Sequence, residues 1–482
     1  MRIILPLYVG MSTYNYDPAY VYLLNGVSIF LGFPAAHADH PGTPTQVVIA
    51  LVAGLWWSLF DRAPGTLMDA ALADPEKYVR MLGLFFLGCN VAANWFLGRR
   101  VSAAAASLPV AVIAQTGPLF LGILAPRLVY ASPEPMLLAL TMTMLGLLSG
   151  EIFGSRSRRP GLASSLAAGA LGGVALAAKL TFAPMLAVLF VVGRDRRLLA
   201  CLLAAFVAMI VSLLPVYEYA GAIVRWVLAL ATHKGHYGTG ERGIVLDVPV
   251  VVAQLKKTWD ALPILYAGLI AASIALFLRF DRVSAAILAA LALQLGLVAK
   301  PIQLHYLASG VPLATVALAR LSGIAGARLA GLSAVLAVGL GCLWTGVALQ
   351  GLRAERATRS AEVREIEKVL VRYPGARIIG AYPAPEWTYA LNFALGYTAF
   401  PFRLEASVKI PSDISYHGGG LLAWVSAGYG PLRFLTPYLA AGRPVLLLFP
   451  RDIPFDRFEC EEPVRTGGNF HVCRVLKVLD PE

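Results

Sequence analysis

The sequence predicts a mainly α, polytopic helical membrane protein with a small α/β domain at its C-terminal end. Of its 482 residues, 58% are hydrophobic and only 14% are charged, and the mean hydropathy is +0.69. A soluble domain needs a more polar surface than this composition can supply. The formal net charge is +12, and the arginines between the apolar segments fall in alternate loops. We therefore expect membrane lipid, and no nucleic acid, as a partner.

Apolar segments of about membrane-crossing length recur from the N-terminus to about residue 350. A hydrocarbon core needs roughly 17 to 25 apolar residues per helix, and shorter spans are tolerated where helices pack together. The segments are 79–97, 102–124, 133–150, 161–178, 180–193, 198–215, 262–278, 283–299, 306–319 and 329–350. Residues 1–14 form a further, shorter candidate. The chain is thus expected to have about 11 spans.

Arginines mark alternate connections between these segments and so predict the topology. If Met1 lies inside, the positive-inside rule holds along the chain. The inner connections carry Arg99 and Arg100, the arginines of 155–160, 194–197 and 279–282, and Arg320 with Arg328. The loop at 216–261 and everything after about Gly351 then lie outside. We expect an integral, multi-pass protein of a bacterial inner membrane.

The chain is expected to divide at about residue 351. Residues 1–351 would form the transmembrane domain, with a first outer loop at about 15–78, and 352–482 an extracytoplasmic α/β domain. The second part begins with an amphipathic helical pattern and contains two buried strand patterns, "ARIIGAYP" and "RPVLLLFPR". Further helices are expected near 385–395 and 431–441.

Cys460 and Cys473 bracket a Gly-Gly turn in this C-terminal part. This arrangement is typical of a hairpin disulfide, which persists in an oxidising compartment and agrees with an external location. The zinc alternative is weaker, because only His471 is nearby and a closed zinc site needs four ligands.

Ionisable residues stand at the predicted outer ends of several spans. An ionic group near hydrocarbon is costly and normally faces an interior cavity or an ion partner. The residues are Arg80, Arg127, Glu134, Lys179, Lys300 and His305, which precedes Tyr306. For each lysine, the alternative is that it snorkels to the membrane interface. Because several cations gather on one face, we interpret them as a binding site.

The first outer loop holds a second group of polar residues in "NYDPAYVYLLNGVSIFLGFPAAHADHPGTP", namely Asp17, His37, Asp39 and His40. Asp17 precedes Pro18 and an apolar helical pattern, which is the arrangement of a helix N-cap. The "DHPG" stretch has the composition of a turn. Both structural roles remain open beside a functional one.

Three stretches carry a family resemblance that covers roughly residues 10 to 350. They are "YDPAYVYLLNGVSIFLGFPAAHADHPGTP", "GGVALAAKLTF" and "HYLASGVPLA". With them, the chain resembles the C-type-fold membrane glycosyltransferases, including protein O-mannosyltransferases and bacterial aminoarabinose and lipopolysaccharide-core transferases. The resemblance implies transfer of a sugar, with inversion, from a polyprenyl-phosphate-linked donor to a lipid, glycan or protein acceptor. It also implies an extracytoplasmic active site with Asp17 at the position of the catalytic acid.

This chemistry gives the polar residues roles. A polyprenyl phosphate is already a good leaving group, so transfer needs one base for the acceptor hydroxyl and cations for the departing phosphate, whereas a glycoside hydrolase needs two carboxyl groups. Asp17 is the candidate base, and Asp39 is a second catalytic candidate that could orient the acceptor or, with His40, hold a divalent ion. Lys179, Lys300, His305, Tyr306 and Arg80 are expected to bind the donor phosphate. A cofactor is not required, and a metal remains open.

The predicted outer loop at 216–261 is rich in glycine and basic residues, including His233 and His236. Such a loop could close over an anionic headgroup, or it could simply be solvated. With His37, His40, Arg127 and Glu134, these histidines are candidate substrate contacts. The chain has no nucleotide-binding fingerprint, which favours a lipid-linked donor over a sugar nucleotide.

Two other function classes compete. A flippase or exporter of lipid-linked sugars would also be polytopic, but transporters place charges near the midplane and often consist of two related halves. Here the charges gather at one face and no internal repeat is visible. A polysaccharide polymerase or ligase would share the lipid substrate, with its reacting residues in the large outer loop.

Overall fold

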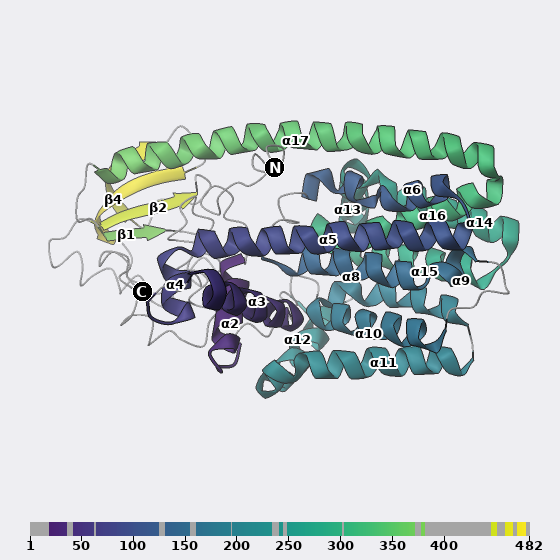
Figure 1. Cartoon of the computed structure of the whole chain (residues 1–482). Helices are drawn as coiled ribbons and strands as arrows, with labels where there is room; N and C mark the ends of the chain where they lie inside the picture. Colours follow the sequence, from purple (N-terminus) through teal and green to yellow (C-terminus); the bar gives the residue numbers. More distant parts are fainter. Residues whose placement is uncertain are drawn as a thin grey trace. The chain divides into compact units, whose positions relative to one another are not determined.

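In the computed structural model, the described part of the chain is mainly helical, with four short strands towards the C-terminal end (Figure 1). The described residues are 19–35, 42–61, 64–124, 131–154, 161–193, 195–233, 241–243, 248–300, 303–371, 377–380, 445–450, 458–465 and 470–478. The chain forms two compact units, which we describe separately. Unit 1 consists of residues 1–36, 50–80 and 350–482, and unit 2 of residues 37–49 and 81–349.

Most helices of unit 2 lie where the sequence predicts apolar spans. The helices are α5 (Pro75–Ala105, which begins in unit 1), α6 (Leu108–Gln115), η3 (Gly117–Leu124), α8 (Pro133–Leu147), α9 (Ser149–Phe153), α10 (Leu162–Ala178), η4 (Leu180–Val192), α11 (Arg196–Leu213), η5 (Leu214–Tyr219), α12 (Ala220–Thr232), α13 (Val248–Ala261), α14 (Pro263–Arg279), α15 (Arg282–Gly296), η7 (Leu297–Ala299), η8 (Leu304–Leu307), α16 (Gly310–Ala325) and α17 (Ala327–Val371, which ends in unit 1). The predicted outer loop at 216–261 is largely helical among its described residues, because α12 and α13 lie within it. The mainly α prediction is confirmed.

Some boundaries differ from those predicted. The segment predicted at 102–124 is broken, because α5 continues to Ala105 and Ala106 then adopts a left-handed φ of 48°. Helix α6 restarts with a proline in its first turn, where a missing N–H is tolerated. The segment predicted at 198–215 is longer than expected, since α11, η5 and α12 follow one another without a gap.

Within the described residues, four helical segments are long and apolar enough to cross a membrane, which makes the chain an integral membrane protein. They are Thr43–Asp61, Pro75–Ala105, Arg196–Thr232 and Ala327–Ala354, and the pair α13 and α14, bent by 97°, could form a fifth. The other apolar helices have 10–17 residues. The count of about 11 spans therefore remains a prediction. Thr43–Asp61 was expected to lie in the first outer loop at about 15–78, and its length and apolar composition make it a candidate span instead.

Small residues bring α10 and α11 close together, side by side in Figure 1. A Cβ added at Gly169 would lie 2.0 Å from the carbonyl oxygen of Cys201, and one at Gly173 would lie 2.0 Å from that of Ala205. The two glycines are four residues apart and so share one helix face. This is the small-xxx-small pattern by which membrane helices pack backbone to backbone.

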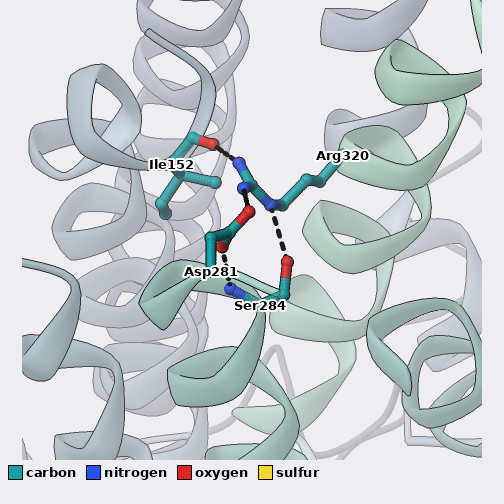
Figure 2. Close-up of polar contacts among 4 residues, drawn as sticks. All are labelled: Ile152, Asp281, Ser284 and Arg320. Carbon is teal, nitrogen blue, oxygen red and sulfur yellow. Dashed lines mark hydrogen bonds and ion pairs between the residues drawn. The ribbon is translucent and has the colours of Figure 1, made fainter. Parts of the chain in front are cut away.

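A polar network joins three elements at the end of unit 2 where α14 meets α15 (Figure 2). The Arg320 guanidinium on α16 donates to the Ile152 carbonyl of α9, to Ser284 Oγ at 3.2 Å and to Asp281 Oδ2 at 2.7 Å. Asp281 also caps α15 by accepting the Ser284 N–H at 2.8 Å. Burial opposes ionisation of Asp281, but the Ser284 N–H and Arg320 outweigh it and hold the pKa of this carboxyl below its ordinary value.

We expect Arg320→Met to lower the thermal stability of the purified protein in detergent. The substitution leaves the Ile152 carbonyl and the Asp281 carboxylate without their guanidinium partner, at a cost of about 2 kcal/mol for a partly exposed pair. Arg328→Met, at an exposed arginine near the start of α17, is the matched control and should change stability by less than about 0.5 kcal/mol. Equal losses in the two variants would contradict a stabilising role for the network.

The N-terminal helices of unit 1 occupy the region predicted as the first outer loop. They are α2 (Ala19–Phe30), the part of α3 (Thr43–Trp56) from residue 50 onwards, the π-helical turn η2 (Trp57–Asp61) and α4 (Leu67–Ala73). Helix α2 is nearly fully buried and packs on α4. Helix α4 starts with a capping box, in which Thr66 accepts the Asp69 N–H at 3.2 Å and Asp69 accepts the Thr66 N–H at 2.7 Å.

Four strands of unit 1 form one sheet in the order β1-β2-β4-β3. They are β1 (Arg377–Gly380), β2 (Val445–Pro450), β3 (Phe458–Arg465) and β4 (Phe470–Val478). Strands β1 and β2 are parallel, and the other two pairs are antiparallel. Both predicted strand patterns contain one of these strands, whereas the helices predicted near 385–395 and 431–441 lie outside the described residues.

Cys460 and Cys473 lie on the two strands of the hairpin β3–β4. The register pairs Cys460 with Val475, two residues beyond Cys473 along β4, next to an irregularity in the ladder. The hairpin agrees with the sequence analysis, and the disulfide remains a prediction.

Candidate active site

Unit 2 buries an ionic cluster made of Glu134, Lys179, His305 and Tyr306. Glu134 follows Ser132 and Pro133 and lies in the first turn of α8, where the helix N-terminus favours a carboxylate. Its side chain is only 4% exposed. A carboxylate this deeply buried needs ionic or hydrogen-bonding partners.

Lys179 supplies the first partner. It lies at the junction of α10 and η4, and its ammonium forms an ion pair with Glu134 Oε1. The same ammonium lies 4.3 Å from the centroid of the Tyr306 ring, which is a cation–π contact. Lys179 therefore contacts a carboxylate and an aromatic face instead of extending to the interface, and the snorkelling alternative does not describe it.

His305 supplies the second partner from η8. Its Nε2 lies 3.5 Å from the same oxygen, Glu134 Oε1, and its side chain is 8% exposed. The His305 and Tyr306 rings meet edge to face, with centroids 4.5 Å apart at 81°. The charges of Lys179 and Glu134 cancel, so protonation of His305 would make the cluster positive.

Lys300 occupies a different environment. Its ammonium donates to the backbone carbonyls of Leu230 and, at 2.6 Å, of His233, at the C-terminal end of α12. A lysine at this position satisfies terminal carbonyls and complements the helix dipole. Two of the three ammonium N–H groups are used in this way. His233 also forms a β-bridge with Arg242.

Unit 1 holds a second polar cluster, which the sequence analysis missed. Tyr78 donates its hydroxyl to Asp61 Oδ2 at 2.6 Å, and Lys77 forms an ion pair with the same carboxylate. Tyr20, buried at the start of α2, donates to Glu76 Oε1 at 2.5 Å. The available signal was Asp61 itself, an ionisable residue at the end of the apolar run "VVIALVAGLWWSLF".

The remaining candidates are distributed as follows. Arg80 is exposed on α5 within unit 1. Asp17, His37, Asp39, His40, Arg127 and His236 lie outside the described residues. In the part of the chain that the structure describes, no three His, Cys, Asp or Glu residues are grouped as metal ligands would be.

Comparison with solved structures identifies two full-length matches in fold. Both are structures of ArnT from Cupriavidus metallidurans. The apo structure matches with a TM-score of 0.53 and 14% identity over 97% of this chain and 95% of ArnT. The structure bound to undecaprenyl phosphate matches with a TM-score of 0.52 and 14% identity over 100% and 99%. ArnT is an aminoarabinose transferase of the C-type fold, so the resemblance inferred from the sequence is confirmed at the level of fold. No family model and no curated protein matches the chain.

Proposed function

We propose that the chain is a membrane glycosyltransferase that takes its sugar from a polyprenyl-phosphate-linked donor. The observation that carries this proposal is the fold match over the whole chain to ArnT, one structure of which is bound to undecaprenyl phosphate. Further support comes from the buried cluster of Glu134, Lys179, His305 and Tyr306, which places an ammonium and an imidazole among the helices of unit 2. The acceptor would be a lipid, glycan or protein at the extracytoplasmic face of a bacterial inner membrane.

In the proposed reaction, the acceptor hydroxyl attacks the anomeric carbon of the donor sugar. The bond between this carbon and the phosphate oxygen breaks, its electron pair leaves with the phosphate, and Asp17 takes the proton of the hydroxyl. Attack opposite the leaving group inverts the configuration at the carbon. Asp39 and His40 would orient the acceptor, with or without a divalent ion.

The departing phosphate requires cations in a site with little water. In unit 2 we assign this role to Lys179 and His305, with Tyr306 orienting the Lys179 ammonium through its ring. Arg80, which lies in unit 1, stays a candidate from the sequence alone. Lys300 keeps one N–H group beyond the two that bind the α12 carbonyls, so it could contact the phosphate and hold α12 together.

We expect the purified full-length chain to release free polyprenyl phosphate when it is given a polyprenyl-phosphate sugar and an envelope lipid or polysaccharide extract. Release should depend on the extract, because the acceptor hydroxyl is a reactant. Donor movement between leaflets of proteoliposomes without release would instead support a flippase. Extension of a polymer with release of a diphosphate carrier would support a polymerase or ligase.

A further inference from the structure

Five arginines lie at the helix ends near the Arg320–Asp281 pair of unit 2, and we call them the arginine cluster. They are Arg196 and Arg197 at the start of α11, Arg279 and Arg282 beside the α14–α15 turn, and Arg320 on α16. The two helix connections adjoin, since a Cβ added at Gly193 would lie 3.2 Å from Arg282 Nη1. These arginines are among those that predicted one side of the membrane.

Acidic residues neutralise only part of this charge. Asp195 pairs with Arg197 at 3.2 Å, Asp281 with Arg320 at 2.7 Å, and Glu151 with Arg282 at 3.7 Å. Each of these three carboxylates pairs with one arginine of the cluster.

Arg196 and Arg279 remain as the excess positive charge. Both are exposed, and neither has an ion-pair partner among the residues that the structure describes. The Arg320 network holds the α14–α15 turn against α9 and α16 (Figure 2), so Arg279 extends from a fixed support.

Exposed apolar side chains accompany the two arginines. Phe277 is 80% exposed, Phe280 89%, Leu199 60% and Phe190 53%. Phe280 has a left-handed backbone, with φ of 47°, which a bulky residue adopts only at a cost. Its N–H bonds the Leu276 carbonyl at 2.7 Å and closes α14. Aromatic rings beside exposed cations are typical of a surface that meets acyl chains and headgroups together.

We propose that the arginine cluster binds the headgroup of an anionic phospholipid, with Arg196 and Arg279 contacting the phosphate and the adjacent phenylalanines contacting the acyl chains. The excess charge selects an anionic ligand. The exposed phenylalanines beside the arginines favour a lipid over a soluble anion, because only a lipid has acyl chains that could contact them. The proposal concerns a surface apart from the proposed transfer reaction.

The test is native mass spectrometry of the full chain with phosphatidylglycerol and with phosphatidylcholine. We expect the amount of phosphatidylglycerol bound to the Arg196→Gln, Arg279→Gln double variant to be lower than for the unmodified chain by a factor of about three or more. The reason is that two phosphate contacts near the membrane surface are lost. The matched control is the Arg225→Gln, Arg353→Gln double variant, which removes two exposed arginines from α12 and α17 and should retain the lipid normally.

Three outcomes would overturn the proposal. An equal loss in the control would mean that overall charge, and not this cluster, governs binding. Equal retention of phosphatidylcholine would remove the role of the anionic headgroup. Displacement of phosphatidylglycerol by millimolar inorganic phosphate would identify an ordinary anion site. None of these readouts requires sugar transfer, so failure here leaves the proposed function untouched.

Discussion

Asp17→Asn should lower sugar transfer by roughly 10²-fold or more while the protein still folds. Asparagine keeps the size of aspartate and can still accept a helix-capping hydrogen bond, but it cannot take a proton from the acceptor hydroxyl. A positioned general base contributes on the order of 10² to 10⁴ in rate. The measurement is the initial rate of polyprenyl phosphate release at saturating donor, together with the thermal stability of each variant.

Asp69→Asn is the matched control. Asp69 lies in the same unit, and its carboxylate accepts the Thr66 N–H at the start of α4, which holds its pKa below the ordinary value. Asp69→Asn removes a carboxylate at a helix N-terminus but leaves the proposed base in place. The rate of sugar transfer should therefore be unchanged. If Asp17→Asn transfers normally, Asp17 serves as a helix cap, and Asp39 becomes the candidate base.

Much of the fold could be predicted because membrane helices have a strong local signal. A run of apolar residues bounded by arginine or proline predicts a helix from its own composition, and α10, α14 and α15 lie within a few residues of their predicted bounds. The start of α6 was missed, because the left-handed Ala106 breaks a run that remains apolar throughout. The length of α17 was missed as well, since its apolar and charged parts were interpreted as two separate elements.

The candidate site could be predicted in part. Ionisable residues at the ends of apolar runs identified Glu134, Lys179 and His305 individually, and the structure brings them together. Lys179 and His305 follow Glu134 by 45 and 171 positions respectively. No pattern in one sequence reveals contacts between residues this far apart. The same criterion grouped Lys300 with them, whereas in the structure its ammonium donates to backbone carbonyls at the end of α12. Composition does not distinguish a cation that faces a carboxylate from one that caps a helix, so the phosphate-binding role of Lys300 stays a prediction.

The unit 1 cluster shows a second limit of the sequence. In the sequence, Tyr20 and Tyr78 cannot be distinguished from the apolar residues of their helices, because a tyrosine ring also packs in a hydrophobic core. Only the three-dimensional fold shows that each hydroxyl reaches a carboxylate, Glu76 and Asp61 respectively.

Lys179→Met should destabilise the protein strongly and abolish sugar transfer. It leaves the Glu134 carboxylate, 4% exposed, with His305 Nε2 at 3.5 Å but without its ammonium partner. Removing one member of a buried ion pair typically costs about 3–5 kcal/mol, because the remaining charge stays buried. Loss of transfer in this variant alone would therefore not distinguish a binding role from a structural one.

The Lys179→Met, Glu134→Gln double variant separates the two roles. It replaces the pair by neutral side chains of similar size, which often preserves stability, so thermal unfolding in detergent should return close to that of the unmodified protein. If Lys179 binds the departing phosphate, the stable double variant should still have a kcat/KM for the lipid-linked donor that is about 10²-fold lower or more. This is the scale of one lost electrostatic contact to the transition state. Recovery of transfer together with stability would show that the pair only supports the bundle, and it would remove Lys179 from the proposed phosphate site.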